Sequence, residues 1–525
     1  MKRIYLLSIF TVIWCFCAVI TSFATSMKAY TTDICIYGAT SAGITAACTA
    51  VDEGKSVFLV EPSSRIGGLT AGGLGRTDIG NVGIIKGKSI NFYRRVGKMY
   101  GENRPMFTFE PKVGLAVYKQ MLREANVKPI MNYRVIKVCK RGSRIGNIVL
   151  ENSLKAEKQT RIKISAKEFI DCSYEGDLMA RAGVSYTVGR EANSMYGETY
   201  NGVQMLNEHQ FPDGIDPYRI KGNPKSGLLY GISKLKVGRR GEADKHVQAY
   251  NFRITLTNDP ANRIDITRPE NYDSSRYELL IRLKETLPWK DGFNDVFMWD
   301  LMPNNKTDIN NRGGFSTDMI GANWDYPEAS YKKRHKIWKS HLDYTKGLLY
   351  FIGHDGRIPK DVRDKFNAWG YPKDEYEDNG HFTPQLYVRE ARRMVSSYVM
   401  TQQNCDGKKI AEDCIGWAAY NMDSHNSGRF VVNGMVKNEG DVQVAPHGIY
   451  PISYRSITPR EREADNLLVP VCLSASHIAY GSIRMEPVFM VLGQTSALAA
   501  CEAIDKHNGI VQKVSAKQIM GKVKE

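Results

Sequence analysis

The stretch IYGATSAG, residues 36–43, joins a short apolar segment to an alanine-rich one. Residues 34–37 are apolar and β-prone, which predicts a strand, and residues 44–51 favour a helix. Gly54 follows this run and is a typical helix stop. A glycine loop of this kind is informative only between a strand and a helix, and both flanks are present here. We therefore expect a strand, a tight turn and a helix over residues 34–54.

The loop departs from the dinucleotide-binding pattern G-x-G-x-x-G at one position, because Thr40 stands where the middle glycine belongs. Gly38 is expected to make the tight turn, and Gly43 to let the helix pack closely on the strand. Ser41 and Ala42, at the helix start, offer free N–H groups to a pyrophosphate. The β-carbon of Thr40 limits the approach of the backbone to phosphates, but its hydroxyl is able to donate a hydrogen bond instead.

An acidic residue follows the loop at the distance expected for a ribose contact. A second strand of the buried type, residues 56–60, ends in Glu61. Glu61 follows Gly43 at close to the roughly 20 residues at which an acidic side chain meets a ribose hydroxyl. Strand, helix, strand and acid together predict an α/β fold with a Rossmann-like nucleotide site. An ordinary turn is the alternative interpretation.

A glycine-rich segment then replaces the crossover helix that a nicotinamide dehydrogenase would have. The sequence EPSSRIGGLTAGGLGRTD places Arg65, Gly67 and Gly68 just after the acidic strand end. This segment resembles the two-glycine motif that follows the ribose-binding acid in FAD-dependent oxidoreductases of the glutathione-reductase type. The resemblance implies FAD rather than NAD, with these three residues at the cofactor. A surface loop without a ligand is the alternative.

Two later stretches extend the resemblance. KEFIDCSYEGDLMARAGV, residues 167–184, is similar to the strand and turn that return under the cofactor, and it contains Asp171. SASHIAYGSIRMEPVFMVLGQTSALAACEAI, residues 474–504, is similar to the C-terminal flavin segment, with Glu486 and Pro487 at a helix start. With YNFRITLTNDPANR, LYVREARRM and YRSITPREREADNLLVP, they resemble a bacterial family of FAD-dependent oxidoreductases common in polysaccharide-degrading bacteria.

The resemblance implies a chain with a discontinuous cofactor domain. We expect a Rossmann-like FAD-binding domain, three-layered with a parallel sheet, formed by residues 25–190 and 431–525. Residues 191–430 are then an inserted α+β substrate or cap domain. A length of 525 residues suits such a two-domain protein.

The N-terminus reads as an export signal. A basic pair precedes an apolar run over residues 4–20, and Ser22 and Ala24 are small residues suited to signal-peptidase cleavage. We expect a signal peptide over residues 1–24 and a periplasmic or secreted protein with no stable membrane span after cleavage. Because the run is short for a membrane span, an uncleaved anchor is the less favoured alternative.

Charge and cysteine usage exclude some partners. The formal net charge is +16, but the basic residues are scattered, so we expect no nucleic-acid partner. An anionic glycan or surface remains compatible with this charge. No C-x-x-C motif or metal-finger spacing occurs, and we expect no metal site. The sequence leaves open whether Cys405 and Cys414 pair.

The aromatic residues bear on the substrate. Six of the seven tryptophans, all but Trp14, fall in the middle of the chain. Because sugars stack their C–H faces on indoles, we expect an enzyme that takes a hydride from a C–H bond of a polar, carbohydrate-like small molecule or oligosaccharide and passes the electrons to an unidentified acceptor. A reductase of an unsaturated acid, or a non-catalytic periplasmic carbohydrate-binding protein on a degenerate flavin fold, are the alternatives.

Three residues are candidates for catalysis. Oxidation of an alcohol needs a proton acceptor, and His477 precedes the flavin segment closely enough to serve, if that segment reaches the flavin as the resemblance implies. His447 is an alternative base, and His477 would then be a neighbour of the cofactor; a core role for His477 is a third interpretation. Arg455 is able to fix a hydroxyl or carboxylate with two donors, or to form an interdomain ion pair.

Overall fold

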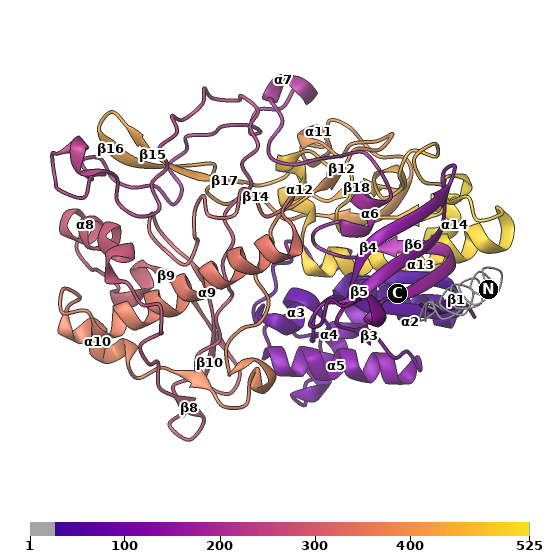
Figure 1. Ribbon diagram of the computed structural model, residues 1–525, viewed down its shortest axis with the longest axis horizontal. Coiled ribbons are helices and arrows are strands. Elements are labelled where there is room, and N and C mark those ends of the chain that lie inside the picture. The colour runs from indigo at the N-terminus through magenta and orange to yellow at the C-terminus, as the bar shows by residue number, and fades with distance from the viewer. Residues whose placement is uncertain (1–26, 524–525) are drawn as a thin grey trace, which may run out of the picture.

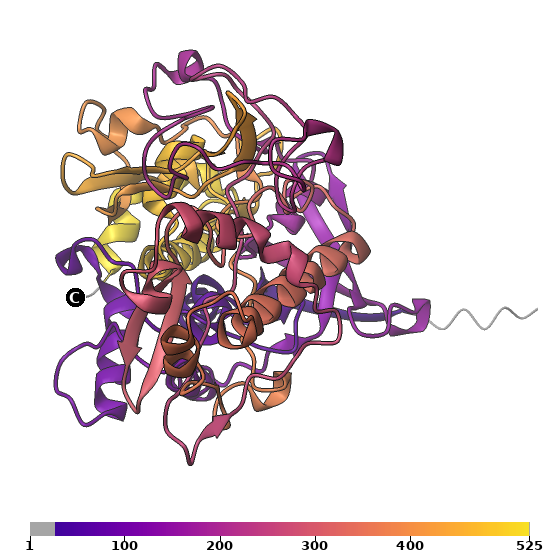
Figure 2. The same cartoon turned by 90° about the vertical axis from the view of Figure 1, so that its left-hand side faces the viewer.

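The computed structural model describes residues 27–523. The predicted signal peptide, residues 1–24, therefore lies outside the described residues. Figure 1 shows that the first part of the chain and its C-terminal segment lie together on one side, while helices from the middle of the chain lie on the other. In Figure 2, turned by 90°, these middle helices lie in front of the rest. The fold is α/β, as the sequence predicts.

The main sheet is built around β1 (Lys28–Tyr37). β1 pairs in parallel with β2 (Val57–Glu61) on one side and with β6 (Ile162–Asp171) on the other. β3 (Ile130–Met131) continues the parallel sheet beyond β2. The carboxyl ends of these strands meet at one edge, which is where open α/β sheets bind ligands.

The sheet is mixed, because the expected parallel strands are extended by an antiparallel hairpin. β4 (Tyr133–Arg141) and β5 (Arg144–Asn152) form a hairpin, and β5 pairs antiparallel with β6. Gly142, with φ of 60°, lies in the tight turn of this hairpin. A tight turn can join only antiparallel strands, because parallel ones need a long crossover. β19 (Leu467–Leu468) pairs in parallel with the end of β6 and brings in the C-terminal part of the chain.

Two hydrophobic cores cover the opposite faces of the sheet. Because side chains alternate along a strand, successive residues of β1 face different cores. Ile36 belongs to the core that also contains α2 (Ser41–Asp52) and α13 (Glu486–Lys506). Tyr37 belongs to the core shared with β4, β5 and α6 (Asp177–Arg181). The helices, the sheet and this second cover form the three expected layers.

The remaining helices and strands complete the chain. In order they are α3 (Gly68–Gly72), α4 (Gly87–Met99), α5 (Pro111–Glu124), β7 (Tyr186–Thr187), α7 (Asn193–Tyr196), β8 (Arg263–Ile264), α8 (Glu278–Thr286), β9 (Phe297–Met302), β10 (Lys306–Asn311), α9 (Tyr331–His354), α10 (Lys360–Phe366), β11 (Tyr371–Pro372), β12 (Arg393–Met394), α11 (Gln402–Cys405), β13 (Cys414–Ala418), β14 (Met422–Ser424), β15 (Gly428–Val432), β16 (Met435–Glu439), β17 (Val442–Val444), β18 (Tyr450–Ser453), α12 (His477–Ile483) and α14 (Ala516–Lys522). Small two-stranded antiparallel sheets dominate the middle of the chain.

Helix α13 joins the C-terminal segment to the glycine loop. Its length and apolar composition would suit a membrane span, uniquely among the helices of residues 27–523, yet 94% of that stretch is buried inside the protein. It packs along α2, as Figure 1 shows, and a β-carbon added at Gly493 would overlap the carbonyl oxygen of Ala42. The two helices therefore approach more closely than any other residue at position 493 allows.

The tryptophans of the middle region serve mostly as packing residues. Trp299 packs against Trp369 with ring centres 5.1 Å apart, and Trp324 stacks on His246 at 3.7 Å. Such contacts fill an irregular core rather than form one shared platform for a sugar. The disulfide that the sequence left open is not formed, since Cys405 and Cys414 are both free thiols.

We predict that Gly493→Ala lowers the free energy of unfolding by about 1–3 kcal/mol, the usual range for overpacking a well-packed core. Gly521→Ala in α14 is the matched control, because a β-carbon there meets nothing within 4 Å and alanine favours a helix. Chemical denaturation followed by circular dichroism measures both. Equal stability of the two variants would contradict the close approach of α13 and α2.

Candidate functional site

The glycine loop has the tight geometry that the sequence predicts. Gly38 has φ of 96°, a conformation that favours glycine, and a β-carbon there would lie 2.8 Å from the backbone of Cys172. A β-carbon at Gly43 would overlap the carbonyl oxygen of Gly38. Both positions therefore exclude a side chain, and helix α2 begins directly against the end of β1.

Thr40 replaces the missing glycine as a helix cap. Its hydroxyl accepts a hydrogen bond from the N–H of Gly43 at 3.3 Å and donates one to the carbonyl of Cys172 at 2.8 Å. The hydroxyl is thus engaged inside the protein. Among the described residues, the backbone N–H groups of Ser41 and Ala42 have no hydrogen-bond partner. Free N–H groups at the start of a twelve-residue helix suit the phosphates of a dinucleotide.

Glu61 lies in the wall of a cavity beside this loop. Its carboxylate accepts hydrogen bonds from the N–H groups of Ala39 and Ser63, both at 2.8 Å. Burial raises the pKa of Glu61, although these hydrogen bonds lower it in part. The cavity has a volume of about 220 Å³ and is also lined by Tyr174 and by Trp338 from the middle of the chain. A buried acceptor at the strand ends fits the ribose of FAD, and the volume fits part of the cofactor.

The segment after Glu61 differs from the expected open loop. Gly67, with φ of 92°, starts the short helix α3, and its N–H donates to the carbonyl of Ala39 at 2.7 Å. A β-carbon at Gly68 would overlap the hydroxyl of Tyr174. Arg65 lines the cavity, but its guanidinium pairs with Asp378 at 2.7 Å. The glycines therefore permit close packing of the chain around the cavity.

Asp171 and Glu486 are both buried, with different partners. Asp171 accepts hydrogen bonds from the N–H groups of Ser173 and Met179 in its own turn, and burial raises its pKa to about 6. Glu486 accepts from the hydroxyls of Thr70 at 2.6 Å and Tyr174 at 2.7 Å. Glu486 therefore ties the start of α13 to α3 and to the turn after β6. Pro487 occupies the first turn of α13, as the sequence predicts.

The three predicted catalytic residues lie in different surroundings. His477 begins α12 with 1% of its surface exposed, and its Nδ1 lies 2.7 Å from a carboxylate oxygen of Glu390. His447 is exposed, and its N–H donates to the carbonyl of Cys405. Arg455 pairs with Asp413 at 3.0 Å on the surface. No hydrogen bond joins these three residues within the part of the chain that the structure describes.

A cluster of buried charges, which sequence reasoning missed, surrounds Tyr387. Arg484 donates to the Tyr387 hydroxyl at 2.8 Å, and the guanidinium of Arg389 lies 4.6 Å above the centre of the Tyr387 ring. Arg253 forms two hydrogen bonds with Asp308. We call this group, together with Asp423, which pairs with Arg484 at 3.1 Å, the Tyr387 cluster.

The Tyr387 cluster keeps unused hydrogen-bonding groups. Arg253 Nη1, Arg389 Nε and Arg484 Nε are buried without a partner. Two carboxylates reach solvent at its edge, Asp423 with 19% and Asp78 with 33% of the side chain exposed. The cluster lies near the cofactor cavity, since Leu386 lines that cavity and Arg484 precedes Glu486 by two residues. A buried donor without a hydrogen-bond partner calls for an explanation, and a bound ligand is one that fits here.

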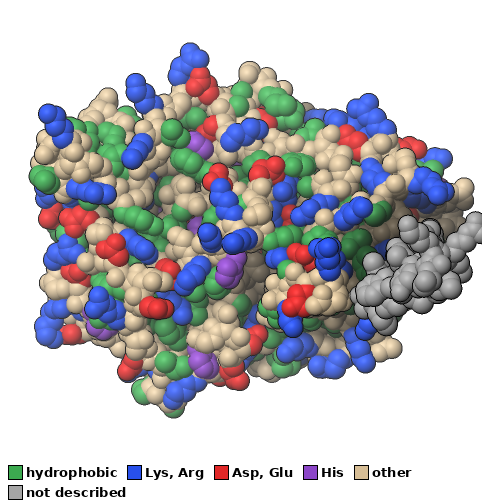
Figure 3. All heavy atoms as spheres, in the orientation of Figure 1, with side chains coloured by type: hydrophobic (Ala, Val, Ile, Leu, Met, Phe, Trp, Pro, Cys, Tyr) green, Lys and Arg blue, Asp and Glu red, His purple; other side chains and the backbone are tan. Residues whose placement is uncertain are grey.

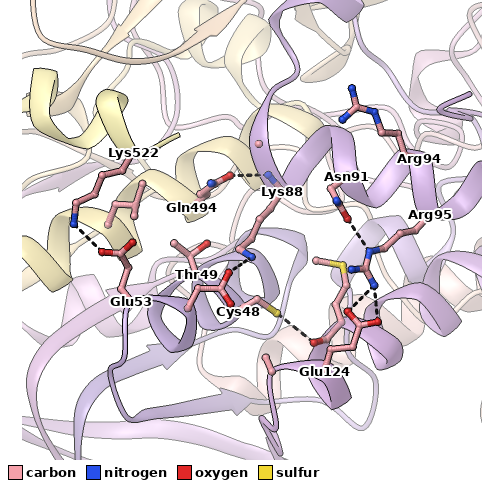
Figure 4. A pocket seen from close by; sticks show the side chains of 15 residues that line it. Cys48, Thr49, Glu53, Lys88, Asn91, Arg94, Arg95, Glu124, Gln494 and Lys522 are labelled. Atoms are coloured by element: carbon pink, nitrogen blue, oxygen red, sulfur yellow. Dashed lines mark hydrogen bonds and ion pairs between the residues drawn. The ribbon is translucent and has the colours of Figure 1, made fainter. Parts of the chain in front are cut away.

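A larger cavity than the Glu61 cavity lies elsewhere. A pocket of about 490 Å³ opens between α2, α4, α5, α13 and α14, and Figure 4 shows its side chains. Its charges are largely paired, for example Lys88 with Asp52 at 2.6 Å and Lys522 with Glu53 at 2.7 Å. We assign no chemistry to it. Within residues 27–523, no three His, Cys, Asp or Glu side chains are arranged to hold a metal ion.

Three solved structures that resemble the protein are distant from it. Thermovibrio ammonificans THI4 is 16% identical, the match covers 36% of this chain and 76% of that one, and the TM-score is 0.24. The flavin-dependent brominase Bmp2 is 17% identical, the match covers 31% of this chain and 42% of that one, and the TM-score is 0.24. AlpK is 8% identical, the match covers 59% of this chain and 49% of that one, and the TM-score is 0.29. A comparison with curated proteins gave no match. At these scores the likeness carries no argument about activity.

Glu486 gives a test by pH. Because its folded pKa is raised, mainly by burial, the folded state loses stability as the pH rises from the ordinary glutamate pKa through the folded one. A glutamine at position 486 does not titrate. The free energy of unfolding of Glu486→Gln, relative to that of the unmodified protein, should therefore rise between about pH 4 and about pH 8. Urea unfolding at both pH values measures this, with exposed Glu208→Gln as control. A stability difference that is independent of pH would count against the raised pKa.

A family model described as FAD dependent oxidoreductase matches residues 33–523. The match includes the glycine loop, Glu61, the Tyr387 cluster and α13. The cofactor is FAD, and the residues around the Glu61 cavity fit its binding. The chain belongs to the FAD dependent oxidoreductase family.

Proposed function

We propose that this oxidoreductase removes a hydride from a C–H bond of a polar, carbohydrate-like substrate that binds at the Tyr387 cluster. FAD, when bound, accepts the hydride. The observation that carries the proposal is the mixture of unpartnered guanidinium donors and partly exposed carboxylate acceptors in one buried place. Sugar hydroxyls both donate and accept hydrogen bonds, so they match such a mixture.

The charge balance of the site also favours a substrate without a charge at this position. Arg253 faces Asp308, Arg389 lies 3.1 Å from Asp318, and Arg484 lies 3.1 Å from Asp423. Each guanidinium therefore has a carboxylate partner, and Asp78 adds a further negative charge near Arg253. A buried ion would need an opposite charge that the cluster has already used. Neutral hydroxyl groups meet no such penalty.

Two histidines are built to accept the hydroxyl proton. His477 Nδ1 faces Glu390, and His425 Nδ1 lies 2.7 Å from Asp318. Burial raises the pKa of each carboxyl, but the facing histidine and a nearby arginine, Arg393 or Arg389, outweigh burial and hold the pKa of Glu390 and of Asp318 at about 2. Both carboxylates therefore stay ionised and orient the ring, so that Nε2 is left to take a proton.

Their positions distinguish the two. His425 Nε2 lies 3.7 Å from Asp423, at the partly exposed edge of the Tyr387 cluster. His477 reaches the cluster only through Glu390 and Gln248, whose amide bridges Glu390 and Arg484. We propose His425 as the proton acceptor. It takes the proton of the alcohol hydroxyl while the hydride leaves the carbon that bears this hydroxyl, so that a carbonyl group forms. A role for His477 as the base stays a prediction from the sequence.

Location and partners belong to the same proposal. We propose that the protein is periplasmic or secreted, on the basis of the apolar run over residues 4–20, and that an unidentified acceptor removes the electrons. On the face shown in Figure 3, basic side chains are interspersed with acidic ones, which supports the absence of a nucleic-acid partner.

Anaerobic reduction of the bound flavin tests the proposed reaction. Mixing the purified protein with saccharides should bleach the flavin absorbance, and the product should carry a new carbonyl group. A protein that neither carries nor binds FAD would favour the carbohydrate-binding alternative. Transfer of electrons from the chemically reduced enzyme to an unsaturated acid, without reduction by any saccharide, would favour the reductase alternative.

We predict that Glu61→Gln weakens FAD binding by about 10- to 100-fold, because a charge-assisted hydrogen bond to the ribose contributes about 1.5–3 kcal/mol. Glutamine keeps an acceptor for the Ala39 N–H, so the loop should stay folded. Titration of the apoprotein with FAD gives the affinity, and exposed Glu461→Gln is the control. An unchanged affinity removes Glu61 from the cofactor site.

We predict that His425→Asn retains FAD but slows flavin reduction by about 10² or more, the usual effect of losing a general base. His477→Asn should slow it by less than about tenfold, since this residue lies outside the cluster. Anaerobic stopped-flow measurements give both rates. The reverse order would return the role of base to His477, and normal rates in both variants would exclude both histidines.

A further inference from the structure

A second pocket lies in the middle region of the chain. It has a volume of about 380 Å³ and opens beside the ends of β10 and of α8, the helix labelled on the left of Figure 1. We call it the His209 pocket; its charged and titratable lining consists of His209, Lys284, Lys290, Asp295 and Arg312. It shares no lining residue with the Glu61 cavity. The pocket is therefore distinct from the Glu61 cavity.

The His209 pocket carries an excess of positive charge. Lys284 pairs with Asp295 at 2.7 Å, which neutralises both. Lys290 and Arg312 are exposed and have no ion-pair partner within the described part of the chain. Their charges remain available in a concave surface, where like charges reinforce one another. The pocket thus favours an anionic ligand, in contrast to the balanced charges of the Tyr387 cluster.

His209 connects this pocket with the substrate site. Its Nδ1 lies 2.9 Å from Asp441 and 3.4 Å from the side-chain amide of Gln443. Gln443 is the cross-strand partner of Asp423 in the pair formed by β14 and β17. Cross-strand partners place their side chains on the same face of a sheet. His209, in the wall of the pocket, is therefore connected to Asp423 through one intervening residue, Gln443.

The electrostatics of His209 agree with this proximity. Burial lowers its pKa, but the hydrogen bond with Asp441 and the charges of Asp318 and Asp423 outweigh burial and raise the pKa above its usual value. The carbonyl of His209 also accepts a hydrogen bond from Asn426, the residue after His425, at 3.2 Å. His209 thus links the wall of the pocket to the segment that carries His425.

We propose that the His209 pocket binds the carboxylate or sulfate group of an acidic saccharide whose neighbouring sugar ring is oxidised at the Tyr387 cluster. This inference rests on the proposed function for the site of oxidation. The cluster fits an uncharged ring, whereas the pocket leaves Lys290 and Arg312 for an anion. A saccharide with one charged and one neutral unit satisfies both.

Binding to the FAD-loaded protein tests the proposal. Titration calorimetry with tetragalacturonate, with a sulfated tetrasaccharide and with maltotetraose compares acidic and neutral saccharides of one length. We expect at least one acidic saccharide to bind about tenfold more tightly than maltotetraose, since exposed charge pairs contribute up to about 1 kcal/mol each. In Lys290→Ala/Arg312→Ala this preference should fall to near unity.

A matched control separates local from overall charge. Arg219→Ala/Lys225→Ala removes the same charge from exposed residues that do not line the pocket, and it should keep the preference. Equal binding of acidic and neutral saccharides overturns the proposal. So does a preference that survives loss of Lys290 and Arg312. Inorganic sulfate or oligoglutamate that binds as tightly as the acidic saccharide overturns the assignment to a saccharide.

Flavin reduction distinguishes this inference from the proposed function. Reduction by neutral saccharides without any acidic preference would leave the proposed function intact and overturn the subsite. An acidic preference that depends on Lys290 and Arg312, without flavin reduction by any saccharide, would support the subsite and overturn the oxidation of a sugar.

Discussion

The close contact between α2 and α13 is the constraint on which the rest of the structure depends. Gly493 has no room for a side chain against Ala42, so the C-terminal helix is fixed against the first helix of the glycine loop. That contact sets the position of Glu486, which holds α3 and the turn after β6 through Thr70 and Tyr174. Arg484, two residues earlier, is thereby placed beside Tyr387. Segments more than 400 residues apart in the sequence thus form one site.

The buried charges around Tyr387 are costly for folding. Removing an arginine and an aspartate from water costs several kcal/mol per ion before their attraction offsets it. Burial without full pairing lowers the pKa of Arg389, which shows that Asp318 compensates only in part. Hydrophobic residues of similar volume would give a more stable core. The retention of such groups close to the Glu61 cavity fits a site that binds a polar substrate.

The difference in charge between the Tyr387 cluster and the His209 pocket would orient a ligand that binds to both. Each arginine of the Tyr387 cluster faces a carboxylate, whereas the His209 pocket has an excess of positive charge, and the strand pair of Asp423 and Gln443 connects the two. A ligand that spans both is oriented by its charge, because reversing it would place an anion among paired ions and a neutral ring among unpaired cations. The exposed cations make this orientation sensitive to salt.

The sequence by itself determined the strand, turn, helix and second strand that carry the glycine loop and Glu61. The spacing of Gly38, Gly43 and Glu61 is set by local geometry, since a strand, a turn and a helix form from neighbouring residues. Pro487 likewise marked the start of α13. The sequence analysis did not identify the hairpin of β4 and β5. Gly142 indicates a turn, but which strand then pairs with β6 depends on contacts between distant segments.

Only the tertiary structure brought together the residues of the proposed substrate site. Arg253, Tyr387 and Arg389 lie in stretches that the sequence analysis quoted, YNFRITLTNDPANR and LYVREARRM, but nothing local shows that these arginines are buried. Their partners Asp308, Asp318 and Asp423 come from other segments. His447 and Arg455 looked equally suitable in sequence, yet the fold places both at the surface, because long-range packing, which no local pattern encodes, decides which polar side chains are buried together.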